Sequence, residues 1–532
     1  MKLRLLTLLV VLATLLGSEA QEWHYRLWFS NKGESGYSLD RPDEFLSART
    51  VAQRERWGIA IDSTDLPIPA TRLQQLSQLG GRILAVSKWL NTATIALTDT
   101  ALFGNIERLP FVARYDYLGS PVQSSNTVRP RQKQVEETDD TTYGDAAWQI
   151  ALHNGDRLHR DGFRGEGMTI AVIDGGFLNA DRNPRFDPDR IVGYHDFIDD
   201  EMDFRNGNAH GSSVLSTLLT NDSNYFVGTA PQASYWLLRS EDTDTEYPTE
   251  EDYWATALEY ADSLGVDVVT SSLGYTGFDD PRFSHTWEQL DGRTAYISQA
   301  AARGVRKGLL IVVSAGNEGG GDWKRLTVPG DVDGLLTVGA VTRERQRAYF
   351  SSVGPTADGR IKPDVAALGA GAATIDPDGN LLQKDGTSFS TPIIAGLTAC
   401  LRQALPHLSA REIIDLIRQN SSQYLTPDSL LGYGIPDFYA AYRQGSGSET
   451  IRTGQTPLQL TYREGSPVVT IGPLPPDESE IALGIYDLEG ALLQEYRLPE
   501  GAELDLHDLK KGIYLLSARG RQHSWTQKIQ RL

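Results

Sequence analysis

Between residues 143 and 443 the sequence alternates between short apolar runs and stretches with helical periodicity. Five apolar runs follow one another, at Thr169–Ile173, Ser234–Leu238, Val266–Val269, Leu309–Val313 and Leu336–Val338. Strands that are apolar on both faces are typical of parallel sheets, because helices cover both sides. The pattern therefore predicts an α/β fold with helices on both faces of a parallel sheet. Ligands of such sheets bind beyond the carboxyl ends of the strands.

Two of the helical stretches begin with the spacing of a capping box. Thr249 to Asp252 precede a helical pattern that Gly265 ends, and Ser409 with Glu412 precede a second one. In a capping box the first side chain accepts a backbone N–H and the acidic side chain reaches back to the first residue. We therefore expect both helices to begin with a side-chain cap.

Four short motifs place residues with complementary chemistry in this region. Asp174 follows the first apolar run, His210 stands before glycine and small residues, and Asn317 follows a later run. Ser388 lies in Gly386–Pro392, directly ahead of an apolar helical stretch. A carboxylate can orient a histidine, the histidine can accept the proton of a serine, and an amide can stabilise an oxyanion. Asp, His, Ser is one of the chain orders of the serine-hydrolase triad.

Each of these residues alone has a simpler explanation. Serines often cap helices, asparagines after glycine often lie in turns, and aspartates often end strands. Ser390 is the nearest rival to Ser388 as a nucleophile, but it fits the motif poorly. The four motifs in one order favour the catalytic interpretation.

Together the segments resemble the subtilisin-like serine proteases (subtilases, peptidase family S8) over about residues 143–443. The resemblance implies a serine endopeptidase with a subtilisin-like fold, in which Asp174, His210 and Ser388 form the triad. It implies that Asn317 supplies the oxyanion donor beside the backbone N–H of Ser388. Protein or peptide substrates would bind to two further segments, which comprise Ser272, Leu273, Gly274, Ala315 and Gly316.

The sequence departs from the usual subtilase pattern at two positions. Ser212 stands two residues after His210, where threonine is usual, and Gly175 follows Asp174, where serine or threonine is common. Both residues keep the side chain small. We therefore expect neither departure to remove activity.

Residues 21–118 mix strand-like runs, such as Arg82–Val86 and Ala93–Leu97, with one polar helix. With the run Ser87–Asn91 and its place before the protease-like region, this α+β block resembles a subtilase propeptide. An accessory domain that stays attached is the alternative. Residues 119–142 form a polar linker, and such exposed segments are where proteolytic cleavage concentrates. We expect the propeptide to be removed there.

Residues 444–451 contain the linker Gly445–Ser448, and residues 452–532 change to short alternating strands, which predict a small all-β sandwich. Within it, Ile485–Gly490, Leu509–Tyr514 and Thr526–Ile529 resemble a type A sorting domain of the type IX secretion system. The resemblance implies the secretion machinery as a partner and a secreted or cell-surface location, reached through the periplasm. A carbohydrate-binding or stabilising β-domain is the alternative.

Net charge, the first twenty residues and the cysteine count indicate which partners, location and cross-links the chain can have. Fifty basic against seventy acidic residues give a net charge of −20, which argues against a nucleic-acid partner. Residues 1–20 have the charged start, apolar run and small residues of a secretory signal, and no later run is long enough to predict a transmembrane segment. The single cysteine, Cys400, excludes an internal disulfide and is expected to be a buried apolar residue.

We predict no required cofactor and no metal site. Asp331–Gly334 and Asp376–Gly379 lack a full calcium-loop pattern, although subtilases often bind structural calcium. The alternatives to a general protease are a catalytically idle surface-displayed binding protein on the same fold, a peptide ligase, and a narrow processing protease. The acidic segment Glu241–Glu246, with Glu250 and Glu251, is expected to rim the substrate cleft and to favour basic substrate residues.

Overall fold

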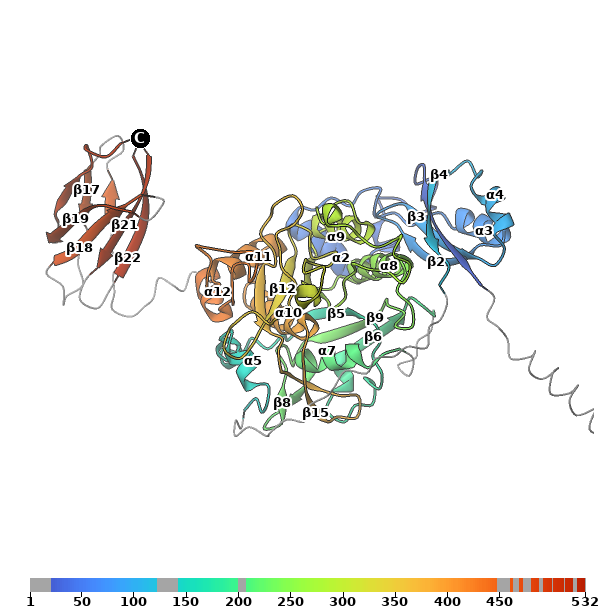
Figure 1. Cartoon of the computed structure of the whole chain (residues 1–532), viewed down its shortest axis with the longest axis horizontal. Helices are drawn as coiled ribbons and strands as arrows, with labels where there is room; N and C mark the ends of the chain where they lie inside the picture. Colours follow the sequence, from blue (N-terminus) through green and yellow to red (C-terminus); the bar gives the residue numbers. More distant parts are fainter. Residues whose placement is uncertain are drawn as a thin grey trace, which may run out of the picture. The chain divides into compact units, whose positions relative to one another are not determined.

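The apolar runs form the strands of one seven-stranded parallel sheet in the computed structural model (Figure 1). Its strand order is β13-β12-β11-β10-β5-β9-β6. The strands are β5 Thr169–Asp174, β6 Ile191–Asp196, β9 Ser234–Arg239, β10 Val268–Ser271, β11 Leu310–Ser314, β12 Leu336–Val341 and β13 Val365–Leu368. The parallel sheet is confirmed, but β6 and β13 were not predicted, because β6 has interrupted apolar residues and half of β13 is alanine, which is a poor strand former.

The structure describes residues 21–121, 142–199, 207–446, 460–462, 468–471, 480–487, 491–499, 501–510, 512–519 and 524–531. The predicted signal and most of the processing region and second linker lie outside these residues. The chain divides into two compact units, residues 1–446 and 447–532. Within the described residues, no helix has the length and apolar character needed to cross a membrane.

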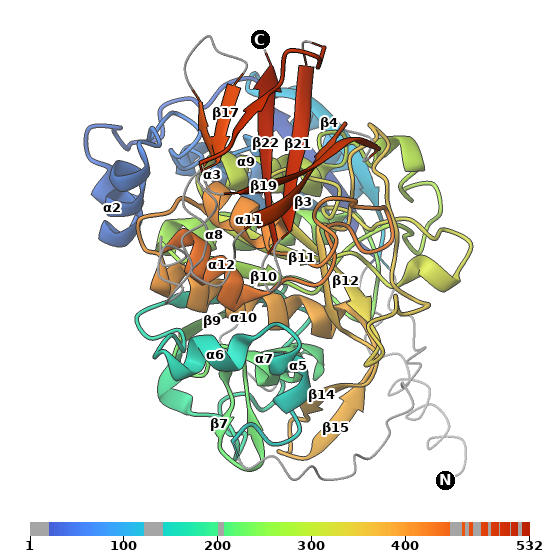
Figure 2. The same ribbon diagram turned by 90° about the vertical axis from the view of Figure 1, so that its left-hand side faces the viewer.

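Helices cover both faces of the sheet, as the apolar strands predict. The helices of one face are α7 His210–Leu219, α10 Thr387–Ala404, α11 Ala410–Gln419 and α12 Phe438–Gly445, with the short α5 Ala147–Ala151 and α6 Gly155–Arg160 beside them. The other face carries α8 Thr249–Leu264 and α9 Tyr296–Arg306. Figure 2 shows α10 between α7 and strand β10. Successive residues of β5 alternate between the two cores, Ile170 and Val172 in one, Ala171 and Ile173 in the other.

Both predicted helix starts can be compared with the structure. The Ser409–Glu412 box is formed, with both reciprocal hydrogen bonds. The box at Thr249 is wrong: Pro248 precedes the helix without a side-chain cap, and the Thr249 hydroxyl bonds to His24 instead. Gly265 ends α8 in the left-handed conformation, as predicted.

Residues 21–121 form a four-stranded antiparallel sheet in the order β2-β3-β1-β4. The strands are β1 Trp23–Phe29, β2 Arg82–Ser87, β3 Thr92–Leu97 and β4 Val112–Gly119, and the helices are α2 Ala48–Trp57, α3 Ala70–Gln78 and α4 Phe103–Ile106. The prediction of one helix was wrong, because the charged α2 is held by ion pairs such as Arg54–Asp262 more than by an apolar stripe.

This N-terminal domain packs on α8 through buried polar contacts. Arg26 of β1 bonds to Asp252 through Nη2 at 2.5 Å and through Nε at 2.8 Å. Glu259 accepts backbone N–H groups from Lys88 at 2.8 Å and Trp89 at 3.1 Å. Contacts of this kind hold the N-terminal domain in a defined place on the helix.

The second unit consists of two antiparallel sheets. One contains β16 Leu460–Tyr462, β17 Val468–Ile471 and β20 Glu503–Asp505, and the other contains β18 Glu480–Tyr486, β19 Leu492–Pro499, β21 Gly512–Arg519 and β22 Ser524–Arg531. Leu504 of the first sheet shares a core with Ile481, Leu483 and Ile485 of the second. The sheets therefore pack face to face, as a sandwich does.

The remaining elements are short. They are the strand pairs β7 Asn221–Asp222 with β8 Phe226–Val227 and β14 Ala372–Ile375 with β15 Leu381–Lys384, and the 3₁₀ segments Pro42–Glu44, Thr100–Leu102, Pro188–Arg190, Trp287–Gln289 and Glu318–Gly320. Cys400 is fully buried in α10, as expected. Burial raises the pKa of its thiol, so it is inert at neutral pH.

Candidate active site

Asp174 and His210 meet at the carboxyl edge of the large sheet. Asp174 is the last residue of β5 and is fully buried, while His210 is the first residue of α7. His210 Nδ1–H donates to Asp174 Oδ1 at 2.8 Å, and the backbone N–H of Gly175 donates to the same oxygen at 2.8 Å. The bond to Nδ1 leaves Nε2 of the imidazole as the nitrogen that can accept a proton.

The electrostatics of the pair favour a charged histidine. Burial of His210 opposes its charged form, but the charge and hydrogen bond of Asp174 outweigh burial and raise the pKa of the imidazole. The charge of Glu241 acts in the same direction. His210 is therefore suited to accept a proton and to hold it beside a carboxylate.

Ser388 is the second residue of α10, and its side chain faces the end of β10. Its Oγ donates to the carbonyl of Ser272 at 3.3 Å, and the Ser272 hydroxyl donates to the carbonyl of Ser388 at 2.8 Å. The ring of Phe389, the next residue, lies 5.7 Å from that of His210. No hydrogen bond within the described residues joins Ser388 to His210.

Gly386 precedes α10 with φ of 153°, a backbone conformation that side chains disfavour. This sharp turn places Ser388 at the positive end of an 18-residue helix. The glycine in the motif is therefore required by the backbone as well as by the space that an approaching ligand needs.

Asn317 follows β11, and its side chain is exposed beside Thr387. Its Oδ1 accepts the backbone N–H of Thr387 at 2.9 Å and the Thr387 hydroxyl at 2.9 Å. Because a backbone N–H needs an acceptor, these bonds fix which side-chain atom is oxygen and which is nitrogen. The amide Nδ2 is thereby left to donate elsewhere, next to Ser388.

The predicted substrate segments lie beside these residues, with one difference between them. Ser272 and Leu273 are buried, while Gly274 is partly exposed, and its backbone has no hydrogen-bond partner among the described residues. A Cβ at Gly274 would lie 2.1 Å from Thr327 Oγ1, so only glycine fits there. Ala315 is fully buried, and its N–H and C=O both bond within the fold. Gly316 separates it from Asn317.

The two candidate calcium loops use their carboxylates internally. Asp331 accepts the Ser298 hydroxyl at 2.7 Å and the Gly292 N–H at 2.7 Å. Asp376 accepts the N–H groups of Asp378 and Asn380 in its own turn. Both carboxylates therefore stabilise loops in this structure.

A group of three carboxylates, which we call the acidic cluster, lies in the connection from β9 to α8. It consists of Glu241, Glu246 and Glu250, and one carboxylate oxygen of each lies within 4.8 Å of the chosen oxygens of the other two. The sequence indicated an acidic rim but not this convergence, since only the fold brings positions 241, 246 and 250 together.

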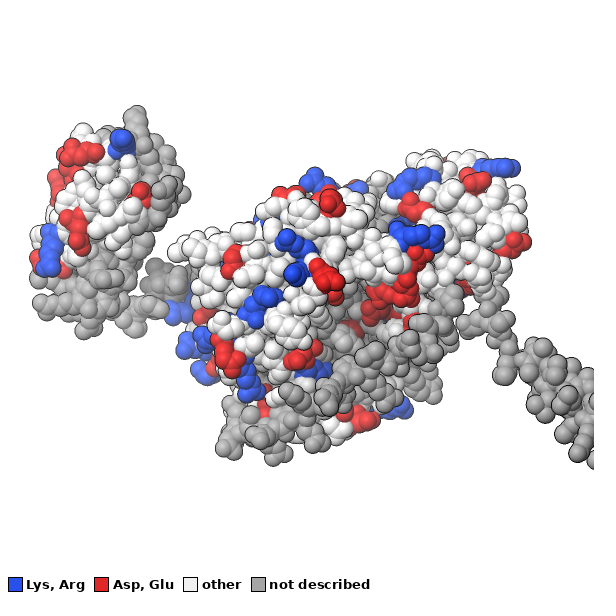
Figure 3. All heavy atoms as spheres, viewed as in Figure 1, with Lys and Arg blue, Asp and Glu red and all other residues white. Residues whose placement is uncertain are grey.

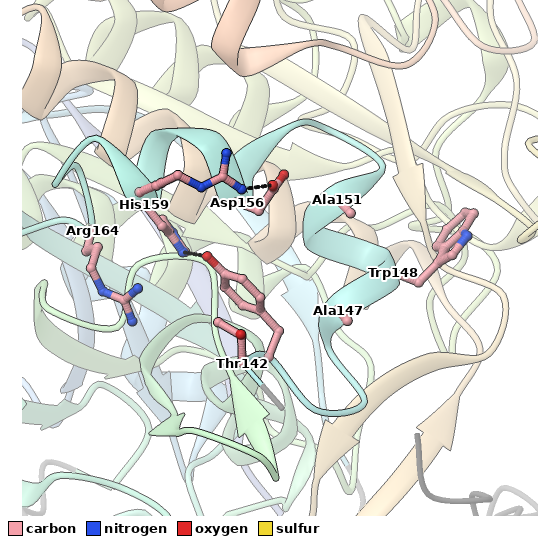
Figure 4. Close-up of a pocket in the computed structure, with 9 residues that line it drawn as sticks. Thr142, Ala147, Trp148, Ala151, Asp156, His159 and Arg164 are labelled. Carbon is pink, nitrogen blue, oxygen red and sulfur yellow. Dashed lines mark hydrogen bonds and ion pairs between the residues drawn. The ribbon is translucent and has the colours of Figure 1, made fainter. Parts of the chain in front are cut away.

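A separate surface hollow of about 640 Å³ lies away from these residues (Figure 4). Tyr143 bonds to His159 and Arg160 pairs with Asp156 along its wall. None of the predicted site residues lines it. The hollow is therefore separate from the predicted site.

Comparison with known families agrees with the three-part organisation. Residues 165–434 match the model of the subtilase family, residues 24–137 match a peptidase S8 propeptide domain of Bacteroidota, and residues 468–530 match a secretion system C-terminal sorting domain. The sorting domain indicates a secreted or cell-surface protein.

Individual relatives are similar over the protease region. A thermostable alkaline protease of Halalkalibacterium halodurans is 27% identical over 58% of this chain and 76% of its own length. Subtilisin NAT of Bacillus subtilis subsp. natto is 26% identical over 70% of this chain and 86% of its own. A crystal structure of MycP1 without its N-terminal propeptide has a TM-score of 0.46 and 25% identity, covering 56% of this chain and 96% of that one.

The family match covers 270 of 532 residues, since it runs from 165 to 434, and it contains every predicted site residue. Of these relatives, one is an alkaline protease and one is a subtilisin. The chain therefore belongs to the subtilase family and is a secreted serine protease with an S8 propeptide domain before it and a sorting domain after it.

Proposed function

We propose that the chain is an endopeptidase in which Ser388 is the nucleophile, His210 the general base and then acid, and Asp174 the carboxylate that orients it. The observation that carries the proposal is the 2.8 Å bond between Asp174 Oδ1 and His210 Nδ1, at the same sheet edge as Ser388. A histidine held through Nδ1 presents Nε2 in the form that accepts a proton.

In the first half-reaction, Ser388 Oγ attacks the carbonyl carbon of the scissile bond, and its proton passes to His210 Nε2. The C–N bond then breaks, and His210 returns the proton to the leaving amine. In the second half-reaction, a water gives its proton to His210 and attacks the acyl ester. The Ser388 oxygen then leaves with that proton, which frees the carboxylic acid product. Asp174 stays charged throughout and stabilises the imidazolium.

Two donors would stabilise the oxyanion that forms at each attack. One is Nδ2 of Asn317, since the Thr387 groups bond to Oδ1 of the same amide and leave Nδ2 to donate to another group. The other is the backbone N–H of Ser388, in the first turn of α10. Asn317→Ala is expected to lower kcat by about 100- to 1,000-fold, the usual effect of removing one such donor.

The substrate would bind as an added strand beside Ser272–Gly274. The unpartnered backbone of Gly274 offers both a donor and an acceptor to an extended peptide. Main-chain pairing gives affinity for any extended sequence, so selectivity must come from side-chain subsites.

Hydrolysis of casein and of a fluorogenic peptide by Ser388→Ala tests the proposal. The expected loss in kcat is about a millionfold, because removal of a triad serine leaves only the residual effect of binding and oxyanion donors. Ser390→Ala is the matched control, since this neighbouring serine bonds only to the carbonyl of Thr387, and it should keep activity. Full activity in Ser388→Ala would contradict the proposal, and an inert wild-type chain would favour a binding protein on the same fold.

A further inference from the structure

The acidic cluster lies next to the proposed catalytic residues. Glu241 follows β9 by two residues, and β9 pairs with β5, so that Asp174 lies opposite Arg239. A Cβ at Gly175 would lie 2.5 Å from Glu241 Oε2. The glycine that departs from the subtilase pattern is therefore what allows the Glu241 carboxylate to lie against the residue after Asp174.

Backbone hydrogen bonds join the loop of Glu246 to the loop that follows the substrate strand. The backbone N–H of Glu246 donates to Asp279 at 3.1 Å, and the N–H of Asp279 donates to the carbonyl of Glu246 at 2.9 Å. Asp279 follows the segment Ser272–Gly274, which would pair with the substrate. Figure 3 shows acidic side chains gathered over the region of α8 and β9, in the orientation of Figure 1. The acidic cluster and the substrate strand therefore lie at the same edge of the sheet.

The acidic cluster lacks a partner for its charge. Glu250 is 2% exposed, and its Oε1 accepts the N–H of Tyr247 at 3.2 Å, while its buried Oε2 has no hydrogen-bond partner among the described residues. The neighbouring Arg239 pairs with Asp196 and Asp199 instead. No ion pair of the described residues includes a member of the acidic cluster.

A second buried polar atom is influenced by the charge of the acidic cluster. The hydroxyl of Tyr275, the residue after Gly274, is buried and has no hydrogen-bond partner among the described residues. Burial raises the pKa of Tyr275, and the charge of Glu250 and of the rest of the acidic cluster adds to this. An unpartnered hydroxyl and an unpartnered carboxylate oxygen are the groups that a bound ammonium or guanidinium would satisfy.

The pKa values of the acidic cluster agree with the absence of a partner cation among the described residues. Burial raises the pKa of Glu241 to about 7, and the charge of Asp174 adds to it. Burial also raises the pKa of Glu246 to about 8, with Glu241 contributing. A cation between these carboxylates would favour their charged forms.

We propose that Glu241, Glu246 and Glu250 form a subsite for a lysine or arginine side chain of the substrate. The inference rests on the proposed function and names the substrate class of that site. A basic side chain fits the observations better than a resident calcium ion, because Glu241 and Glu246 are partly exposed and calcium prefers six to eight oxygen ligands.

The position of the N-terminal domain indicates which substrate residue the acidic cluster would bind. Gly119, at the end of β4, lies against Tyr247 of the same loop, since a Cβ there would be 2.7 Å from its ring. The chain that precedes the processing region thus reaches the peptidase on the side of the acidic cluster. The subsite is therefore assigned to a residue on the amino-terminal side of the scissile bond.

The test uses the full chain after it has processed itself and pairs of fluorogenic peptides that differ only in lysine or norleucine. Each of the four positions before the scissile bond is compared in turn. At one of them, lysine is expected to raise kcat/KM by about tenfold or more, the range of a hydrogen bond to a charged group. Glu241→Gln and Glu246→Gln should bring the ratio of kcat/KM for the lysine peptide to that for the norleucine peptide close to one.

Asp244→Asn is the matched control, because Asp244 is an exposed acid of the same loop outside the acidic cluster, and it should keep the ratio. A wild-type ratio near one at all four positions would overturn the subsite while leaving the proposed function intact. So would ratios that neither glutamine variant changes, or micromolar calcium binding that Glu246→Gln abolishes. A chain that cleaves neither peptide contradicts the proposed function and, with it, the subsite.

Discussion

Two sets of carboxylates lie on and beside helix α8, and they differ in what faces them. Asp252, Glu259 and Asp262 are buried along the helix, and the N-terminal domain supplies their partners, among them Arg26 and Arg54. The acidic cluster lies before and in the first turn of the same helix, and no cation of the described residues pairs with it.

The difference distinguishes carboxylates that have permanent partners in the same chain from carboxylates that would bind a substrate transiently. The paired set is satisfied by groups of the same chain, so it serves to dock the propeptide domain. The acidic cluster has no cation as a partner in the described chain, and buried charge without a partner is costly. We therefore attribute the first set to assembly of the precursor and the second to recognition of a substrate.

The largest effect is expected from removing a partner of the paired carboxylates Asp252, Glu259 and Asp262. In a Ser388→Ala background, which prevents self-processing, Arg26→Ala leaves Asp252 buried without its cation. Loss of one partner of a buried pair should lower the free energy of unfolding of the N-terminal domain by about 3–5 kcal/mol in urea denaturation. Arg41→Ala removes an exposed pair with Glu44 and should cost less than about 1 kcal/mol. Equal losses of unfolding free energy in the two variants would contradict the structural role given to the paired carboxylates.

The sequence alone predicted the elements that rest on local pattern. The strands with continuous apolar runs form the parallel sheet. Asp174 and Asn317 lie at one edge of it, as their positions after apolar runs indicated, and the helix starts at His210 and Ser388 lie beside them. The capping box at Thr249 failed because His24, 225 residues away, takes its hydroxyl. No local pattern contains such a contact.

Contacts between residues far apart in the sequence also limited what could be predicted about the site. Gly175 was a departure from the family pattern without a reason until the fold placed the Glu241 carboxylate over it. The reciprocal bonds of Ser272 and Ser388 join residues 116 positions apart. The sequence could name the acidic segment, but only side-chain positions show which of its residues converge.

A smaller effect is expected from titrating the acidic cluster. Because the pKa of Glu241 is about 7 and that of Glu246 about 8, the acidic cluster gains negative charge as the pH rises from 6 to 9. The charged or polar groups that face it are Asp174 on β5, His210 on α7, Arg239 on β9, Asp242 in the same loop, and Tyr275 and Asp279 after β10.

The lysine-to-norleucine ratio of kcat/KM should therefore increase from pH 6 to pH 9. Taking the ratio cancels the titration of His210, which affects both peptides equally. Glu246→Gln should flatten the profile, and Asp244→Asn should leave it as in the wild type. A ratio that is independent of pH would mean that the acidic cluster does not contact the substrate charge.

The smallest effect is expected from removing the C-terminal unit, which belongs to neither set. The chain divides after Ser446, and every proposed catalytic residue lies at or before Ser388. Truncation after Ser446 should change kcat/KM on soluble peptides by less than about twofold, while the protein should remain in the periplasm of its host. A folded but inactive product would place the sorting domain within the enzyme, and arrival at the cell surface would contradict its role in sorting.

The central claim, that Ser388 is activated by His210 and Asp174, is tested most directly by locating a covalent adduct. The full chain is treated with a fluorophosphonate after processing, digested, and analysed by mass spectrometry. The account predicts one adduct, on Ser388 within Gly386–Pro392, which is absent when His210 is replaced by alanine. An adduct on another serine, or labelling of Ser388 that does not depend on His210, would contradict it.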